Sequence, residues 1–112
     1  MMRIVVISDG ESLDSEVAED FGHAPFILVV DSDTLDYHII ENEFMDSPEG
    51  AGVAVAKAIT TLKPDAVLTG GIGMHGLDIL RKANIYVSMD EEGSVEQCIR
   101  DFIRRHKRPI AG

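Results

Sequence analysis

Short apolar runs and helix-spaced apolar stripes follow one another along this chain, and their order predicts an α/β fold. Runs rich in Val, Ile and Leu are expected to form strands at residues 3–8, 26–31, 35–42, 65–69 and 85–89. The first run, RIVVIS, is almost uniformly apolar, which is typical of a central strand covered on both faces. Stripes with three- and four-residue spacing predict helices at residues 51–62, at 74–83 and from 95 onward.

Polar capping residues indicate where these helices begin. Residues 11–25 allow two interpretations, either a short helix capped by Ser12 or Ser15, or an ordered loop. Ser47, which is followed by a proline, is expected to cap the next helix. Ser94, with a glutamine three residues later, predicts a capping box for the last helix.

The order of the elements predicts a mixed five-stranded sheet in a three-layer α/β/α arrangement. Only a few polar residues separate the runs at 26–31 and 35–42, so these two are expected to pair as an antiparallel hairpin. The first, fourth and fifth strands are expected to be parallel, joined by β-α-β units whose helices cover both faces. We expect a single domain over residues 1–108, followed by a tail at 109–112.

The composition narrows the class of protein. The 112 residues carry a formal net charge of −10, which argues against nucleic acid as a partner, because nucleic-acid binding relies on Lys and Arg. The same charge disfavours an anionic membrane surface, and no stretch approaches the ~20 apolar residues needed to span a bilayer. A single cysteine excludes an intrachain disulfide and any multi-cysteine metal site. No signal peptide is recognisable, so we expect a cytoplasmic protein.

The stretch DAVLTGGIGMHG, residues 65–76, is the first candidate binding site. Gly70, Gly71 and Gly73 interrupt an apolar strand, and a helical stripe resumes directly after them. Glycines let a ligand approach the bare backbone, and the new helix directs N–H groups carrying roughly half a positive charge toward it. Ligands of open α/β sheets bind beyond the carboxyl ends of strands, where this turn is expected to lie. The turn lacks the spacing and the lysine of nucleotide-binding loops, so its amides are expected to hold a small anion, which includes an anionic metal cluster.

Two histidines and a methionine could contact a metal. His23 falls in a loop between a glycine and a proline, and imidazole suits iron, zinc and copper. His75 falls in the first turn of the helix after the glycine turn, where the helix dipole favours the neutral imidazole that a metal needs. Met74 beside it could line a soft metal site or pack under the turn. His38 and His106 are expected to be structural or solvated, and Cys98, on the apolar stripe of the last helix, is expected to be a buried core thiol.

Three segments of the chain carry a resemblance to a known family. They read SLDSEVAEDFGHAPFILVVD, EGAGVAVAKAI and DAVLTGGIGMHGLDILRKANIYV, and the similarity runs from Arg3 to about Ile103. In this order and spacing they resemble the dinitrogenase iron-molybdenum cofactor biosynthesis family. That family occurs as a stand-alone domain and within proteins that carry or insert nitrogenase metalloclusters, such as NifX and the C-terminal domain of NifB. The resemblance implies a ribonuclease H-like fold without nuclease activity, and an iron-sulfur or iron-molybdenum type cluster bound at the loops beyond the strands.

The resemblance also implies which positions face the ligand. The family's aspartate-glycine after the first strand corresponds to Asp9 and Gly10, its phenylalanine-glycine loop to FGHA at 21–24, and its glycine turn to residues 70–73. Many members carry a histidine or cysteine just before the central helix. Here that loop reads MDSPEGAG, whose acidic and methionine side chains are poor ligands for soft iron-sulfur chemistry.

The predicted function is that of a non-enzymatic metal-cluster carrier. The residues expected around the ligand come from three segments of the chain and are Asp9, Gly10, Gly22, His23, Gly70, Gly71, Gly73, Met74 and His75. With few soft ligands, binding is expected to be weak and reversible, which suits transfer between cluster donor and acceptor proteins. The alternative is a binding or regulatory module for a small anionic metabolite or a protein partner at the same edge. Catalysis is not expected, because the first strand lacks the interior carboxylate that a nuclease of this fold needs.

Overall fold

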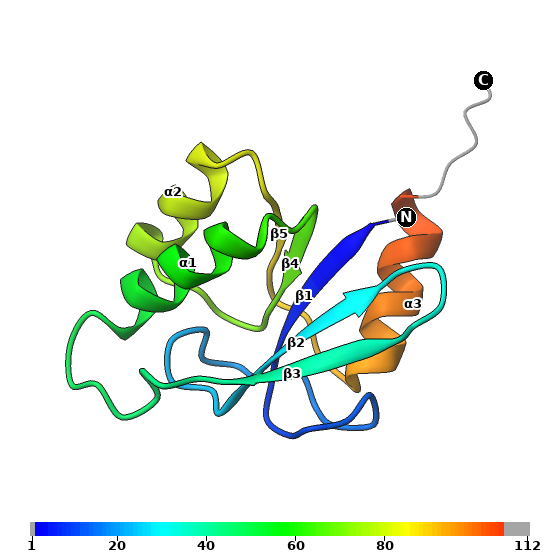
Figure 1. Ribbon diagram of the computed structural model, residues 1–112, viewed down its shortest axis with the longest axis horizontal. Helices are drawn as coiled ribbons and strands as arrows, with labels where there is room; N and C mark the ends of the chain where they lie inside the picture. Colours follow the sequence, from blue (N-terminus) through cyan, green and yellow to red (C-terminus); the bar gives the residue numbers. More distant parts are fainter. Residues whose placement is uncertain (1, 107–112) are drawn as a thin grey trace.

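The computed structural model describes residues 2–106, which form one mixed sheet with helices on both faces (Figure 1). The elements follow the chain as β1 (Arg3–Ser8), β2 (Phe26–Asp31), β3 (Tyr37–Glu41), α1 (Ala51–Leu62), β4 (Ala66–Leu68), α2 (Met74–Lys82), β5 (Tyr86–Ser88) and α3 (Val95–His106). The first two strands have the predicted bounds, and the other three are shorter than expected by one or more residues at each end. The predicted tail at 109–112 lies outside the described residues.

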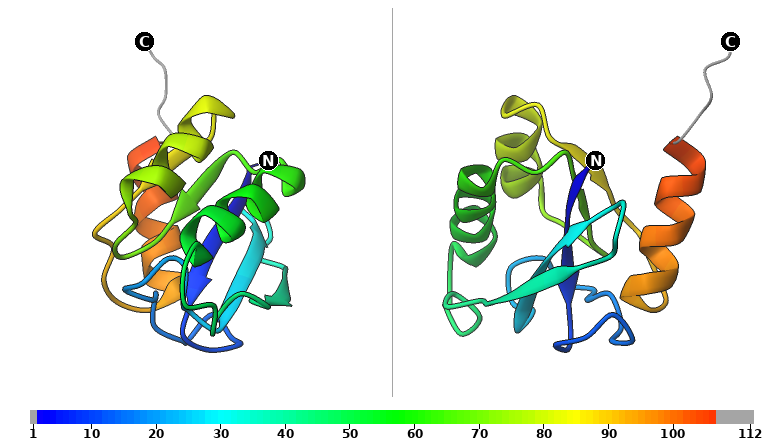
Figure 2. Two further views of the ribbon diagram at one scale, coloured as in Figure 1. Left: turned by 90° about the vertical axis from the view of Figure 1, so that its left-hand side faces the viewer. Right: turned by 45° about the vertical axis from the view of Figure 1, so that its right-hand side comes forward.

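The sheet has the strand order β3-β2-β1-β4-β5, with β1 in the centre. β1 and β2 are antiparallel, as are β2 and β3, so the predicted hairpin is confirmed. β1 pairs with β4 and β4 with β5 in parallel, as expected. Figure 2 shows α1 and α2 on one face of the sheet and α3 on the other, which is the predicted three-layer, ribonuclease H-like arrangement. None of the helices within residues 2–106 is long and apolar enough to cross a membrane.

The alternation of side chains along β1 divides the core into two parts. Val5 and Ile7 face α1 and α2, whereas Ile4 and Val6 face α3, and all four are fully buried. Since successive side chains of a strand point to opposite faces, an apolar residue at every position is what a strand covered on both faces requires. This explains why RIVVIS reads as a continuous apolar run.

Residues 9–25 form an ordered loop, which decides between the two interpretations of this segment. Its backbone groups pair with the sheet and not with one another in a helix. The Ala18 N–H donates to the Ile7 carbonyl at 2.8 Å, and the Gly70 N–H donates to the Ala18 carbonyl at 2.9 Å. Further along, Asp20 pairs with Gly71 in a parallel bridge. The loop therefore lies against the glycine turn that follows β4.

The helix caps agree only in part with the sequence. α1 begins at Ala51 and its cap is Gly50, with φ at 75° and no side-chain hydrogen bond, so the expectation that Ser47 caps this helix was wrong. Ser47 instead belongs to the preceding turn, where its N–H donates to the Phe44 carbonyl at 3.0 Å. In α3 the Ser94 hydroxyl accepts the Gln97 N–H at 3.1 Å as expected, although the Gln97 side chain bonds Asp101 and does not complete the box.

Candidate functional site

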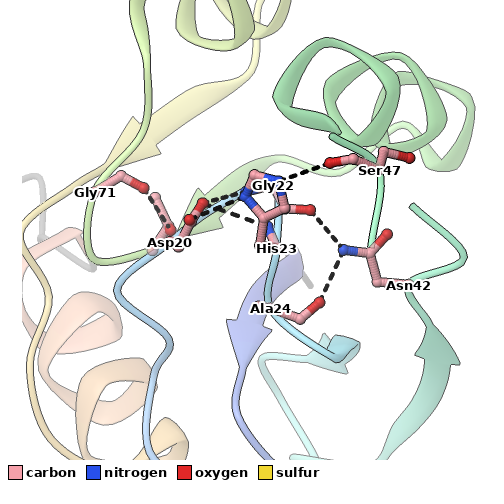
Figure 3. Close-up of polar contacts among 8 residues, drawn as sticks. Asp20, Gly22, His23, Ala24, Asn42, Ser47 and Gly71 are labelled. Atoms are coloured by element: carbon pink, nitrogen blue, oxygen red, sulfur yellow. Dashed lines mark hydrogen bonds and ion pairs between the residues drawn. The ribbon is translucent and has the colours of Figure 1, made fainter. Parts of the chain in front are cut away.

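A cleft of about 390 Å³ opens where the 19–23 loop meets the N-terminal ends of α1 and α2. Its walls are tied together by the backbone, because the Gly71 N–H donates to the Glu19 carbonyl and the Phe21 N–H donates to the Gly71 carbonyl at 3.2 Å. Figure 3 shows this junction, with the Asp20–His23 segment beside the glycine turn. The lining residues come from three segments and are Glu19, Asp20, Phe21, Gly22, His23, Gly52, Gly71, Ile72 and Gly73.

α1 and α2 both start at the cleft, and neither has a side-chain cap at its N-terminus. Their cap residues are Gly50 and Gly73, and neither helix has a side-chain hydrogen bond at its start. The first N–H group that donates within the helix is that of Ala54 in α1 and that of Leu77 in α2. The N–H groups of residues 51–53 and 74–76 therefore have no carbonyl partner within their own helix. α3, on the opposite face, is capped by a serine. The cleft is therefore bordered by two sets of backbone donors and two positive dipole ends, which favour an anion.

Glycine is required at position 22 because the 19–23 loop lies directly on the first turn of α1. A Cβ atom at Gly22 would come within 2.7 Å of the Gly52 nitrogen, a backbone atom that has no flexible side chain to move away. A Cβ atom at Gly76 in α2 would lie 3.3 Å from the Gly52 carbonyl oxygen. The absence of side chains at these positions lets the loop and both helix starts come together at one place.

The structure brings together some of the predicted ligand-facing residues but not all of them. Gly22, His23, Gly71 and Gly73 line the cleft. The others lie outside its lining, namely Asp9, Gly10, Gly70, Met74 and His75. Of these, Asp9 lines an adjoining hollow of about 390 Å³ that His23 also borders, and Gly70 lines another of about 300 Å³. Met74 is 83% exposed in the first turn of α2, and His75 beside it is also exposed.

Sequence reasoning missed Gly52 and the acidic residues of the 19–23 loop. Gly52 belongs to the EGAG segment, which is too short and common a pattern to identify a site alone. Phe21, in the same loop, is 2% exposed and belongs to the core under α1 and α2 as well as to the cleft wall. The close approach of Gly22 to Gly52 joins residues 30 positions apart, so only the tertiary structure reveals it.

The His23 side chain joins two loops at the edge of the cleft (Figure 3). Its Nδ1 lies 3.0 Å from a carboxylate oxygen of Asp20, and its Nε2 lies 3.1 Å from the Ser47 carbonyl oxygen. Both partners are acceptors, so the imidazolium, which carries a proton on each nitrogen, satisfies both contacts. The hydrogen bond to Asp20, followed by the one to the Ser47 carbonyl, raises the pKa of His23 above its usual 6.5. For His23 to bind a metal, one of these contacts must be released.

The Asp20 carboxylate is held by the same contacts. Partial burial acts to raise its pKa, but the hydrogen bonds from the His23 ring and from the Gly22 N–H outweigh burial and lower the pKa below 3.8. The Asp20 oxygens also accept N–H groups from the loop that follows, at 3.0 Å from Gly22 and 3.3 Å from His23. The negative charge of Asp20 is therefore offset locally by the imidazolium and the backbone.

Side-chain ligands for a bare metal ion are not gathered anywhere in residues 2–106, where no group of three or more His, Cys, Asp or Glu could hold one. Cys98, on the inner face of α3, is buried as predicted, and its thiol donates to the Glu92 carbonyl at 3.2 Å. Burial, with the nearby Glu91 carboxylate, raises the pKa of Cys98 to about 12, so the thiolate that metals bind does not form at neutral pH. The donors that the cleft offers are mainly backbone amides.

These features define a class of α/β protein in which a glycine-lined cleft between two helix N-termini can accept an anion. The chain belongs to the dinitrogenase iron-molybdenum cofactor family, whose model matches residues 2–105. This confirms the resemblance seen in the sequence.

Two solved structures share the fold over almost the whole chain. The apo form of the orange protein from Desulfovibrio gigas is 31% identical, with a TM-score of 0.88, over 94% of this chain and 89% of its own. A putative NifB protein from Thermotoga is 24% identical, with a TM-score of 0.77, over 93% of this chain and 89% of its own, and supports the fold alone. A comparison with proteins of curated function finds no significant match.

Proposed function

We propose that this protein is a non-enzymatic carrier of an anionic metal cluster of iron-sulfur or iron-molybdenum type, related to the accessory proteins of nitrogenase cofactor biosynthesis. The observation that carries the proposal is the pair of helix starts without side-chain caps, both bordering one glycine-lined cleft. Membership in a family described by the iron-molybdenum cofactor supports a cluster as the anion.

The cluster's sulfide or oxo groups accept hydrogen bonds from the first-turn N–H groups of α1 and α2. Gly52 and Gly73 carry no side chain, so the anion can come close to the backbone at both helix starts. The Glu19 side chain on the same rim repels an anion, whereas the Asp20 charge is already offset by the His23 ring, so one carboxylate limits how tightly an anion is held. Binding of moderate strength suits transfer from a donor protein to an acceptor protein.

Metal contacts from histidine are a further part of this proposal. His23 borders the cleft and reaches a metal only after releasing Asp20 or the Ser47 carbonyl. His75 lies in the exposed first turn of α2, close in sequence to the cleft residue Gly73. The anion would first bind to the backbone amides, and these two side chains would contact its metal afterwards.

A small anionic metabolite is the second candidate ligand. The backbone amides would bind a carboxylate or an oxyanion as readily as a sulfide, because the interaction depends on negative charge. The lack of a three-ligand metal group in residues 2–106 favours this candidate. A partner protein presenting an acidic group at the cleft would use the same donors.

Anaerobic reconstitution distinguishes these candidates. Wild type is incubated with iron and sulfide, and separately with molybdate and sulfide, and visible absorption and bound metal are measured after desalting. The proposal predicts coloured protein with stoichiometric metal, lost in Gly73→Asp and weakened in the His23→Ala, His75→Ala double variant. His38→Ala, which alters an exposed histidine on β3, is the matched control. No colour under either condition would overturn the carrier proposal and favour the small anion.

A further inference from the structure

Asn42, at the end of β3, uses its whole side chain to hold the loop that lines the cleft. Its amide nitrogen donates to the Gly22 carbonyl at 2.9 Å and to the Ala24 carbonyl at 2.8 Å (Figure 3). Its amide oxygen accepts the Phe44 N–H at 2.9 Å. The residue is 8% exposed, and its backbone N–H donates to the Pro25 carbonyl at 2.9 Å. Both amide protons and the amide oxygen therefore have partners.

This pattern of contacts is specific for a carboxamide. Two carbonyl oxygens face the nitrogen and one N–H faces the oxygen, so the orientation of the amide follows from its partners. An aspartate has nearly the same shape but offers only acceptors when ionised, and would set negative oxygens against two carbonyls. A serine has one donor and is too short to span both.

Asn42 holds both of the segments that the contact between His23 and the Ser47 carbonyl joins. On one side, it fixes the carbonyls immediately before and after His23, those of Gly22 and Ala24. On the other side, it starts the turn that carries the Ser47 carbonyl, because the Asn42 carbonyl accepts the Met45 N–H at 3.2 Å. The same loop places Gly22 against the first turn of α1. Asn42 itself is not part of the cleft lining.

We propose that Asn42 is a positioning residue for the ligand cleft, which sets the affinity for the anion by holding residues 22–24 against α1 and the 44–47 turn without touching the ligand. This inference rests on the proposed function, since it assumes that the cleft binds an anion. Replacing Asn42 should weaken binding by about 10- to 100-fold, by analogy with the loss found when groups that orient the ligands of a metal site are removed.

The test compares the affinity of folded Asn42→Asp for molybdate with sulfide, by anaerobic absorbance titration, with that of wild type. Asn84→Asp is the charge-matched control, because Asn84 is exposed beyond the far end of α2. Ile99→Val, on the buried side of α3, is the control for stability, since it lowers stability on the other face of the sheet. Asn42→Ser is measured in parallel and decides the question should Asn42→Asp not fold. Backbone NMR signals of Gly22, His23 and Ala24 are recorded without ligand for each variant.

The proposal expects the affinity to fall by at least about tenfold in the Asn42 variants and to stay near wild type in both controls. It also expects the ligand-free signals of residues 22–24 to move in the Asn42 variants only. Wild-type affinity in the folded variants would overturn the positioning role while leaving the proposed function intact. An equal loss of affinity in Ile99→Val would also overturn it, because general destabilisation would then explain the effect. Failure of wild type to bind would reject the proposed function and this inference together.

Discussion

Replacing Gly52 by alanine should move the stability of the fold and the affinity for the ligand in opposite directions. Gly52 lies in the first turn of α1 with no atom within 4 Å of the position of an added Cβ, so the substitution causes no clash. Alanine in a helix is favoured over glycine by about 0.5–1 kcal/mol, so the free energy of unfolding should rise by up to that amount. Because Gly52 lines the cleft, the methyl group takes up space that the anion needs at the helix start. A change of one methylene in a hydrophobic pocket is commonly worth about tenfold or more, and we expect a loss of about tenfold here.

Urea unfolding and the anaerobic molybdate–sulfide titration measure the two effects on the same preparation. Thr61→Ala is the matched control, because Thr61 is an exposed residue near the other end of α1 and alanine favours the helix there too. The control should gain a few tenths of a kcal/mol in stability and keep its affinity. A Gly52→Ala variant that is more stable and binds as tightly as wild type would refute the reasoning, because the ligand would then lie elsewhere.

Three other changes test separate parts of the account. Gly22→Ala should lower the free energy of unfolding by about 1–3 kcal/mol in urea, since its Cβ would lie 2.7 Å from the Gly52 nitrogen, and unchanged stability would contradict the close approach. Gly73→Asp should stabilise α2 by a few tenths of a kcal/mol in thermal unfolding and abolish anion binding, because the carboxylate would cap the helix in place of the ligand. An NMR titration should place the pKa of His23 above 6.5. The contact between His23 and Asp20 should add stability that is fully present below pH 6.5 and is lost as the pH rises through the raised pKa of His23. At low pH the same stability should be lost once Asp20 protonates. Equal pH dependence in wild type and His23→Ala would contradict this.

The parts of the fold that follow from local patterns could be predicted from the sequence. The continuous apolar run of β1 and the helical stripe of α3 reflect burial on both strand faces and on one helix face. The sequence predicts a ligand site at the glycine turn after β4; Gly71 and Gly73 do line a cleft there, and ligand binding stays a prediction. In each case the residues that determine the structure are close together in the sequence.

The parts that depend on distant contacts could not be predicted. Residues 9–25 contain serines suited to helix caps, but their backbone groups gain partners in β1, in the glycine turn and near α3. α1 begins directly after Gly50, whose φ is positive, and Ser47 is then too far from the helix start to act as its cap. Likewise, the contact of His23 with the Ser47 carbonyl and the bonds of Asn42 to Gly22 and Ala24 arise only when the segment after β3 comes against the 22–24 loop.

The measurement that most directly tests the central claim is an anaerobic titration of ¹⁵N-labelled protein with molybdate and sulfide, followed through the backbone amide signals. If the cleft holds the anion on backbone donors, the largest changes fall on the first turns of α1 and α2, at 51–53 and 74–76, and on the glycines between β4 and α2. The first turn of α3, which Ser94 already caps, is the internal reference and should not change. Saturating binding with changes confined to α3 or the β2–β3 hairpin, or no change at all, would contradict the account.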